Sequence, residues 1–183
     1  MKRALWLLLA ALIAAGCGSD DGDGDDRAET SAPTGELTTF ESPRIPFTFD
    51  YPKDFVAEKR PREKVLARVA VERGSRLNAI KVRRTARREL DPERYLDAFQ
   101  RDFERTVGTV DKGEERIGGL DVGVLEFEDS VKRHGKEVEF SSASYFFKGA
   151  GGTWQLECIA DADHKSKVDA ACRAALESVD FGR

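Results

Sequence analysis

The chain has 183 residues, of which 40% are hydrophobic and 35% are charged, and its formal net charge at pH 7 is −4. This composition is that of a globular domain with a highly charged surface, and it excludes a bundle of membrane-spanning helices. The negative charge is concentrated in residues 18–36, so the rest of the chain is close to neutral. It therefore lacks the basic field expected of a nucleic-acid-binding protein.

The N-terminus has the features of an export signal. Two basic residues precede twelve uncharged ones, residues 4–15, which predicts a signal peptide over residues 1–16. At about 1.5 Å per residue this stretch spans about 18 Å, too short for a ~30 Å hydrocarbon core. The stretch ends in Ala14-Ala15-Gly16-Cys17, which resembles a bacterial lipobox except that Ala14 stands where leucine is usual.

The resemblance to a lipobox implies that the chain is cut before Cys17 and that the sulfur of Cys17 carries a diacylglycerol. Two or more acyl chains give stable membrane anchoring, whereas one does not. We therefore expect a lipid-anchored protein on the extracytoplasmic face of the cell membrane. The alternative is an ordinary secretory cleavage site with a cysteine beside it.

Residues 17–36 follow as an acidic segment without a large apolar side chain. Such a segment cannot bury enough surface to offset its ordering entropy, so we expect a disordered tether. Asp21, Asp23 and Asp25 alternate like the start of a calcium loop. The glycine and glutamate that such a loop needs are replaced by Asp26 and Ala32, which favours a solvated spacer.

Residues 37–183 form the expected folded domain. Apolar and polar residues alternate over residues 45–51, over residues 65–71 and around Ile80 and Val82, which predicts three strands. Further strands are expected at residues 114–117, 120–127, 137–147 and 153–160, and glycines lie at the turns between them.

Two amphipathic helices are expected. Asp91-Pro92 is a strong helix start, and an apolar stripe at helical spacing follows up to Gly108. The stripe consists of Tyr95, Leu96, Phe99, Phe103 and Val107. A closing helix that begins near Asp163 places Val168, Ala171, Cys172, Ala175, Leu176 and Val179 on one side. Strands joined by glycine turns, together with two such helices, predict an α+β fold, an antiparallel sheet of six or seven strands covered by two helices.

Cys158 and Cys172 are candidates for a disulfide. Trp154, Leu156 and Cys158 share one face of the last strand, and Cys172 lies in the apolar stripe of the closing helix. An exported protein folds in an oxidising compartment, and lipidation of Cys17 would leave an even pair. The alternative is two buried free thiols.

The order of these elements, the helix after Asp91-Pro92, the hairpin at Ile117-Gly118-Gly119-Leu120 and the final strand and helix resemble the PsbP-like fold. More narrowly, they resemble the exported lipoproteins of the LpqN type in actinobacteria. The resemblance covers about residues 37–181. It implies an accessory or binding role in the cell envelope and no shared catalytic site.

Residues that could carry catalysis are few. The histidines are His134, in a turn that contains a glycine, and His164, at a helix start, and no further ligands accompany them at the spacing of a metal site. Ser141, Ser142 and Ser144 have no histidine near them in the sequence. We therefore expect no metal, no cofactor and no enzymatic activity.

The clearest charged feature is basic. Between Lys59 and Arg94 there are thirteen bases and five acids, and the densest group is Arg83, Arg84, Arg87 and Arg88. These arginines are a candidate patch for an anionic partner, such as a lipid head group, a phosphorylated glycan or an acidic protein. The alternative is a solvated surface whose charges pair with acids elsewhere.

Three functions are compatible with these features. The first is a non-enzymatic envelope lipoprotein that binds a partner protein or an anionic envelope component. The second is a carrier of a small apolar or lipid ligand between sheet and helices, lined by Phe99, Phe103, Phe140, Phe146 and Trp154. The third is an envelope hydrolase, which would need a cleft where a histidine meets a serine and a carboxylate.

Overall fold

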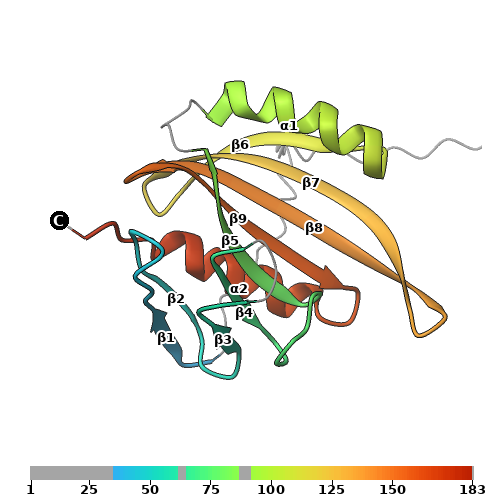
Figure 1. The fold of residues 1–183 in the computed structure, drawn as a ribbon, viewed down its shortest axis with the longest axis horizontal. Coiled ribbons are helices and arrows are strands. Elements are labelled where there is room, and N and C mark those ends of the chain that lie inside the picture. The colour runs from blue at the N-terminus through green and yellow to red at the C-terminus, as the bar shows by residue number, and fades with distance from the viewer. Residues whose placement is uncertain (1–34, 62–64, 87–91, 183) are drawn as a thin grey trace, which may run out of the picture.

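In the computed structural model the described residues are 35–61, 65–86 and 92–182, with only the backbone described for residues 92–94. Nine strands and two helices are formed within these ranges (Figure 1). In chain order they are β1 (Leu37–Phe40), β2 (Phe49–Pro52), β3 (Val56–Glu58), β4 (Ala67–Ala70), β5 (Ala79–Ala86), α1 (Pro92–Val107), β6 (Asp111–Ile117), β7 (Leu120–Arg133), β8 (Lys136–Gly149), β9 (Gly152–Asp161) and α2 (Lys165–Glu177).

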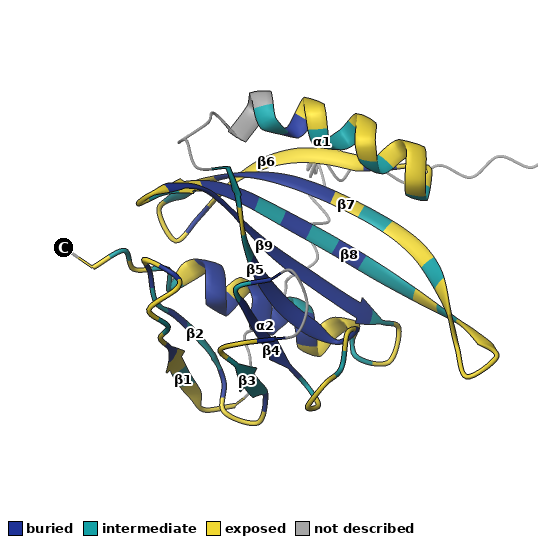
Figure 2. Cartoon of the chain, in the orientation of Figure 1, coloured by how far each residue is buried: buried dark blue, intermediate teal, exposed yellow. Residues whose placement is uncertain are grey.

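The main sheet has seven antiparallel strands in the order β3-β4-β5-β9-β8-β7-β6. The predicted α+β class and the predicted strand number are confirmed. The last strand in the chain, β9, pairs with β5 on one side and β8 on the other, so it lies inside the sheet. Figure 2 shows β9 buried along nearly its whole length, whereas the tip of the β7–β8 hairpin is exposed.

The two helices cover opposite faces of this sheet. On β7, Leu125 packs into the cluster that includes Leu96 of α1, whereas its neighbour Val124 belongs to the cluster that includes Val168 of α2. Successive side chains of a strand point to opposite faces, so this alternation defines an α1 face and an α2 face. Neither helix in the described part of the chain is long and apolar enough to cross a membrane.

The α1 helix is held by the stripe that its sequence predicts. Tyr95, Leu96, Phe99, Phe103 and Val107 all belong to one apolar cluster with Leu125 and Phe146 of the sheet. Leu96 is 1% exposed and lies directly over Gly123 of β7, where a Cβ atom would come within 2.5 Å of its Cδ1. The missing side chain at Gly123 therefore lets the helix approach the sheet closely.

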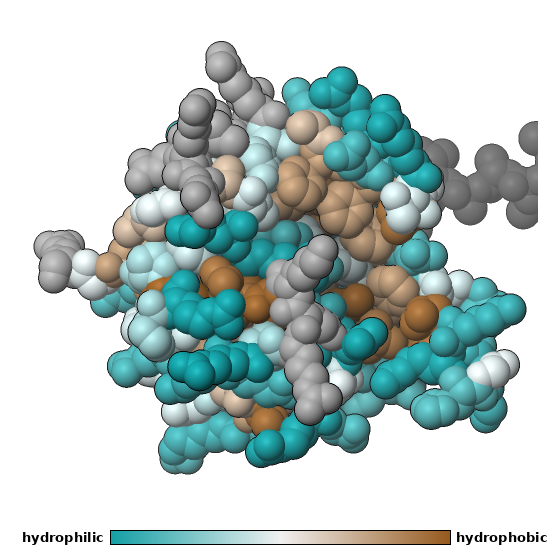
Figure 3. All heavy atoms as spheres, viewed as in Figure 1, coloured by the Kyte–Doolittle hydropathy of each residue, from teal (hydrophilic) through white to brown (hydrophobic). Residues whose placement is uncertain are grey.

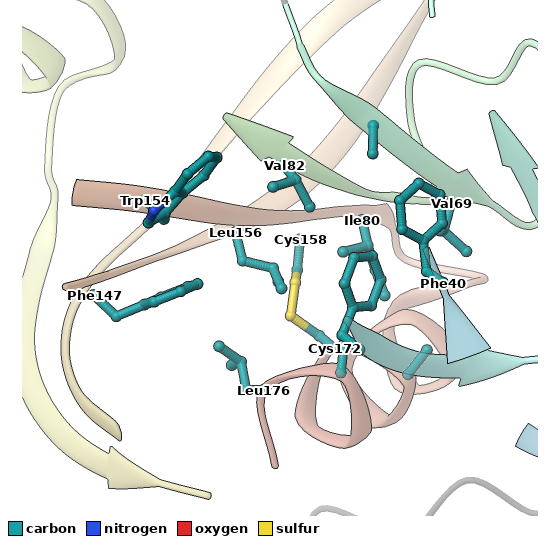
Figure 4. Close-up of a cluster of buried hydrophobic side chains, with 14 of the residues drawn as sticks. Phe40, Val69, Ile80, Val82, Phe147, Trp154, Leu156, Cys158, Cys172 and Leu176 are labelled. Atoms are coloured by element: carbon teal, nitrogen blue, oxygen red, sulfur yellow. A yellow bond between two sulfur atoms is a disulfide. The ribbon is translucent and has the colours of Figure 1, made fainter. Parts of the chain in front are cut away.

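The α2 helix closes the larger core (Figure 4). Trp154, Leu156 and Cys158 of β9 point together into this core, as their spacing predicts, and Cys172 of α2 faces them. The structure joins Cys158 to Cys172 by a disulfide, with 6.2 Å between their Cα atoms. The covalent link therefore ties the central strand to the helix that covers it.

The predicted strand over residues 45–51 is wrong in its extent. Only its end is a strand, β2, which pairs with β1 in a separate two-stranded sheet that packs against α2. Ile45 and Phe47 are 6% and 3% exposed, so they are buried as predicted, but their backbone is irregular. Pro46 lacks an amide hydrogen for a ladder, which explains why the strand begins only after it.

Candidate functional site

The end of β5 is where the predicted basic patch enters the structure. Arg83 and Arg84 are adjacent, so the strand directs them to opposite faces, Arg83 to the α1 face and Arg84 to the α2 face. The pairing with β9 shifts register between Arg84 and Ala86, which marks an irregularity of the kind that re-aims side chains at a strand end. Arg87 and Arg88, the other two predicted residues, lie outside the described residues.

Both arginines nevertheless line one concavity of about 470 Å³, which we call the arginine pocket. A third arginine, Arg44, comes from the segment between β1 and β2, and Phe99 comes from α1. The described residues that line it are Arg44, Leu66, Arg83, Arg84, Thr85, Phe99 and Gln155. Its size lies within the range of small-molecule sites, about 300–1,000 Å³.

The pocket carries a surplus of positive charge. Arg83 donates from Nη2 to Oε2 of Glu157 at 3.0 Å, and Lys81 Nζ lies 3.7 Å from the same oxygen, so two cations share one carboxylate. In the described part of the chain, neither Arg44 nor Arg84 takes part in an ion pair. The arginine pocket can therefore accept an anion without first breaking a salt bridge of Arg44 or Arg84.

Two of the guanidinium groups are held in place by their surroundings. Arg84 lies over the ring of Trp154, with Cζ 6.0 Å from the ring centre, at the limit of a cation–π contact. Arg83 is fixed by Glu157, and its Nε is buried without a hydrogen-bond partner among the described residues. A buried donor without a partner costs about 1–3 kcal/mol, a cost that proteins accept most readily at functional sites.

Other bases of the segment between Lys59 and Arg94 are structural. Arg68 and Lys81 are only 5% and 7% exposed, so they do not belong to a solvated surface. Arg68 donates to Glu58 at 2.8 Å, and this hydrogen bond is the main reason that the pKa of Glu58 lies below its usual range. Part of the basic segment therefore pairs with acids on the α1 face, as the alternative interpretation expected, and the rest lines the pocket.

Several pocket residues were not identified from the sequence as belonging with the arginines. Arg44 is about forty residues before Arg83 in the chain, and Gln155 follows Arg83 by about seventy residues. The β5–β9 pairing places Gln155 directly opposite Arg83, and Gln155 is 3% exposed with its Nε2 bonded to Ser144 Oγ at 2.9 Å. No local pattern in the sequence signals such a meeting, because it depends on the order of strands.

A second concavity, of about 530 Å³, is acidic. Asp111, Glu126, Glu128 and Asp169 line it together with Lys165, which pairs with Asp169 at 2.7 Å. Burial is the main cause that raises the pKa of Glu126, and Lys165 acts in the opposite direction. Among the described residues, no group of three or more histidine, cysteine, aspartate or glutamate side chains is arranged to hold a metal.

The two histidines lie where their sequence context predicts. His134 forms the β7–β8 turn with Gly135, and both have positive φ angles, 50° and 79°. His164 precedes α2, with Nδ1 2.7 Å from Asp161 Oδ1 and 3.1 Å from Asn78 Nδ2. Within the described ranges no serine hydroxyl is hydrogen-bonded to either histidine. The contacts of His164 connect β9, α2 and the start of β5.

The five aromatic residues proposed to line a carrier site do not share one face, so this prediction is wrong as stated. Trp154 lies on the α2 face, in the core of Figure 4. The other four lie on the α1 face, where Phe146 is fully buried and Phe99, Phe103 and Phe140 are half-buried. On the face seen in Figure 3, apolar atoms gather beneath α1 while its outer surface is hydrophilic. Sequence alternation identified the faces of each strand but not which helix covers which face.

The predicted signal peptide, the lipidated Cys17 and the acidic tether up to Thr34 lie outside the described residues. They therefore stay predictions of the sequence. The described chain begins just before β1, where Glu36 and Lys53 form an exposed ion pair at 2.8 Å.

Comparisons with known proteins bear on the fold. No protein-family model matches the sequence, and no curated protein matches it. Similar solved structures include LpqN, involved in cell envelope biogenesis of Mycobacterium tuberculosis (TM-score 0.49, 12% identity, 79% of this chain and 91% of that one); a protein of Bacteroides thetaiotaomicron (0.51, 11%, 79% and 48%); and the PsbP protein CyanoP of Synechocystis (0.47, 12%, 89% and 97%).

An LpqN and a PsbP, the two kinds of protein that the sequence resembles, are both among the similar structures, and the antiparallel sheet with two helices is the α+β fold that the sequence predicts. The chain spans about half the length of the Bacteroides protein that it matches. At these identities the likeness concerns the fold alone.

Proposed function

We propose that this protein is a lipid-anchored extracytoplasmic lipoprotein whose domain binds an anionic component of the cell envelope in the arginine pocket, without catalysing a reaction. The observation that carries the binding proposal is that Arg44 and Arg84 line one pocket beside Arg83 and form no ion pair with any of the described residues. The location follows from the export signal and from Cys17 in its lipobox-like context.

The chemistry of the described lining supports binding of an anion. Three guanidinium groups provide planar sets of donors that fit carboxylate or phosphate oxygens in pairs. Two cations and one anion at Lys81, Arg83 and Glu157 leave one positive charge, and Arg44 and Arg84 add two more. Arg83 is already oriented by Glu157, so less conformational entropy is lost when a ligand binds.

The anchor and the pocket are tested separately. In detergent phase partition of whole cells, the natural chain is expected in the detergent-rich phase, and a Cys17→Ser chain in the aqueous phase. Equal partition of the two chains would refute the lipid anchor and leave the binding proposal standing.

For binding, the Cys17→Ser chain is sedimented with isolated envelopes at low and high salt. We expect co-sedimentation at low salt and its loss at high salt, because exposed charges are screened. The Arg83→Gln/Arg84→Gln variant is expected to stay in the supernatant. The matched control is Arg116→Gln/Arg133→Gln, which removes two exposed arginines at the ends of β6 and β7. Binding that survives the pocket substitutions would refute the proposed site.

A further inference from the structure

The arginine pocket is larger and less uniformly polar than a site for a simple ion. Its volume is about 470 Å³, and Leu66 and Phe99 line it beside the arginines. Phe99 is fixed in the aromatic cluster of α1, with its ring centre 5.1 Å from Phe146 and 4.7 Å from Tyr95. Charged donors therefore meet a rigid apolar wall, and this combination fits a ligand with an anionic group attached to an organic part.

The charge of the pocket distinguishes between anions. A carboxylate brings one negative charge, whereas a phosphate monoester brings about 1.5 to 2 at neutral pH and three acceptor oxygens. The described residues leave a surplus of three positive charges at the pocket, one from the Lys81, Arg83 and Glu157 group and one each from Arg44 and Arg84. A doubly charged anion with several oxygens is the better match for three guanidinium groups that line one concavity, two from β5 and one from the segment before β2.

The other polar side chains of the described lining are Thr85 and Gln155. Thr85 Oγ1 donates to the carbonyl of Thr153 at 3.1 Å, and Gln155 is bonded to Ser144, so both side chains are already oriented. Arg83 Nε is buried with no acceptor among the described residues. Within that part of the chain the pocket lining contains no carboxylate that would repel a phosphate.

From this arrangement we propose that the arginine pocket binds the phosphate group of a phosphate ester, with the organic part of the ester against Phe99 and Leu66. The inference rests on the proposed function and specifies its ligand class. The same chemistry occurs in phosphorylated sugars and in phosphate head groups of lipids.

The test is a calorimetric titration of the full chain in nonionic detergent. The probes are glucose 1-phosphate, soluble dihexanoyl phosphatidic acid, inorganic phosphate, glucose and acetate. We expect at least one of the two esters to bind about tenfold more tightly than inorganic phosphate, with glucose and acetate at least tenfold weaker than phosphate. Comparison of the two esters identifies the source of the phosphate. If acetate binds as tightly as the tighter-binding ester, or if neither ester binds, the inference is wrong.

Variants locate the site. Arg84→Gln is expected to weaken ester binding about tenfold, while Arg133→Gln at the distant hairpin leaves it unchanged. Phe99→Leu, which keeps an apolar side chain for folding, is expected to weaken ester binding without changing that of inorganic phosphate. Nuclear magnetic resonance of the arginine Nε–H groups is expected to show the signals of Arg83 and Arg84 shifting when phosphate is added. Unchanged affinity in Arg84→Gln would overturn the assignment.

This test separates the inference from the proposed function. If no phosphate probe binds, but the pocket substitutions still abolish co-sedimentation with envelopes, the inference fails and the proposed function stands. If the pocket substitutions also leave co-sedimentation unchanged, both fail.

Discussion

Arg83 of β5 and Glu157 of β9 are diagonal neighbours on the α1 face of the sheet, joined by a hydrogen bond of 3.0 Å from Nη2 to Oε2. Lys81 lies 3.7 Å from the same oxygen, and both Lys81 and Glu157 are buried, at 7% and 8% exposed. A single carboxylate thus compensates two cations, the buried Lys81 and the partly exposed Arg83. One of these cations is structural, and the other also lines the arginine pocket.

This arrangement predicts a large effect of Glu157→Gln. The substitution leaves Lys81 buried without its anion, so we expect a loss of about 3 kcal/mol in the free energy of unfolding, typical for breaking a buried ion pair. Urea unfolding at pH 7 measures it. Glu114→Gln on the exposed strand β6 is the control and is expected to change stability by less than about 0.5 kcal/mol. Equal effects of the two substitutions would contradict the role of Glu157.

The disulfide gives the second prediction. Replacement of both Cys158 and Cys172 by alanine opens a loop with a sequence separation of 14 residues. We expect a loss of about 3 kcal/mol on the chain-entropy description of cross-links. Unfolding of the oxidised and double-alanine chains, compared in the same denaturant series, provides the measurement. A thiol assay on the denatured, unreduced chain that detects Cys158 or Cys172 as free would contradict the pairing.

The β6–β7 turn gives the third prediction. Gly118 and Gly119 both have positive φ angles, 57° and 86°, which an alanine adopts only with strain. A Cβ at Gly118 would also lie 2.7 Å from the Cα of Glu177 in α2, whereas at Gly119 it meets nothing within 4 Å. Gly118→Ala is therefore expected to destabilise the chain more than Gly119→Ala, which costs about 1 kcal/mol. The thermal unfolding midpoints of the two variants make the comparison.

The features that the sequence predicts correctly depend on residues close together in the chain, and the features that it misses depend on residues far apart. The stripe of α1 and the shared face of Trp154, Leu156 and Cys158 depend on residues a few positions apart, and both are confirmed. The presence of Arg44 and Arg83 in one pocket depends on how distant segments of the chain pack. Alternation within a strand cannot supply that information, because it describes one strand at a time.

Two predictions failed. The strand over residues 45–51 was inferred from alternation, with Pro46 taken to imply an edge or a strand start, but the segment buries Ile45 and Phe47 without a ladder and the strand begins only at Phe49. The aromatic group failed because Trp154 and Phe140 face opposite sides of one sheet. In both cases the sequence correctly identified apolar side chains, and their partners were decided by tertiary packing.

The fourth prediction concerns the acid limb of the stability profile, which is the decrease in the free energy of unfolding as the pH falls into the acidic range. Burial of Asp161 acts to raise its pKa, but hydrogen bonds from Asn78 and His164 outweigh it, so the pKa lies below the ordinary aspartate value of about 3.9. A lowered pKa contributes stability that is present above the ordinary value and is lost as the pH falls through the lower value of the folded state. Asp161→Asn is expected to reduce stability at pH 7 and to flatten this acid limb. A limb that is unchanged in the variant would exclude Asp161 as a source.

Glu126 gives the last prediction, with the opposite sign. Burial in the acidic concavity raises its pKa, Glu115, Asp169 and Asp111 act in the same direction, and Lys165 opposes them. A carboxyl with a raised pKa binds its proton more readily in the folded chain than in the unfolded one, so stability falls as the pH rises from the ordinary glutamate pKa to the raised pKa of the folded chain.

Glu126→Gln removes this unfavourable charge. The variant is expected to be more stable than the natural chain at pH 7 by about 0.5 kcal/mol or less, and the difference is expected to vanish at a pH below the ordinary pKa of a glutamate. Glu128→Gln, two residues further along the same strand in the same concavity, is the matched control and is expected to show a smaller gain. Urea unfolding of all three chains across this pH range measures both effects. A Glu126→Gln chain that is less stable than the natural one at pH 7 would mean that the attraction of Lys165 for the carboxylate outweighs its burial.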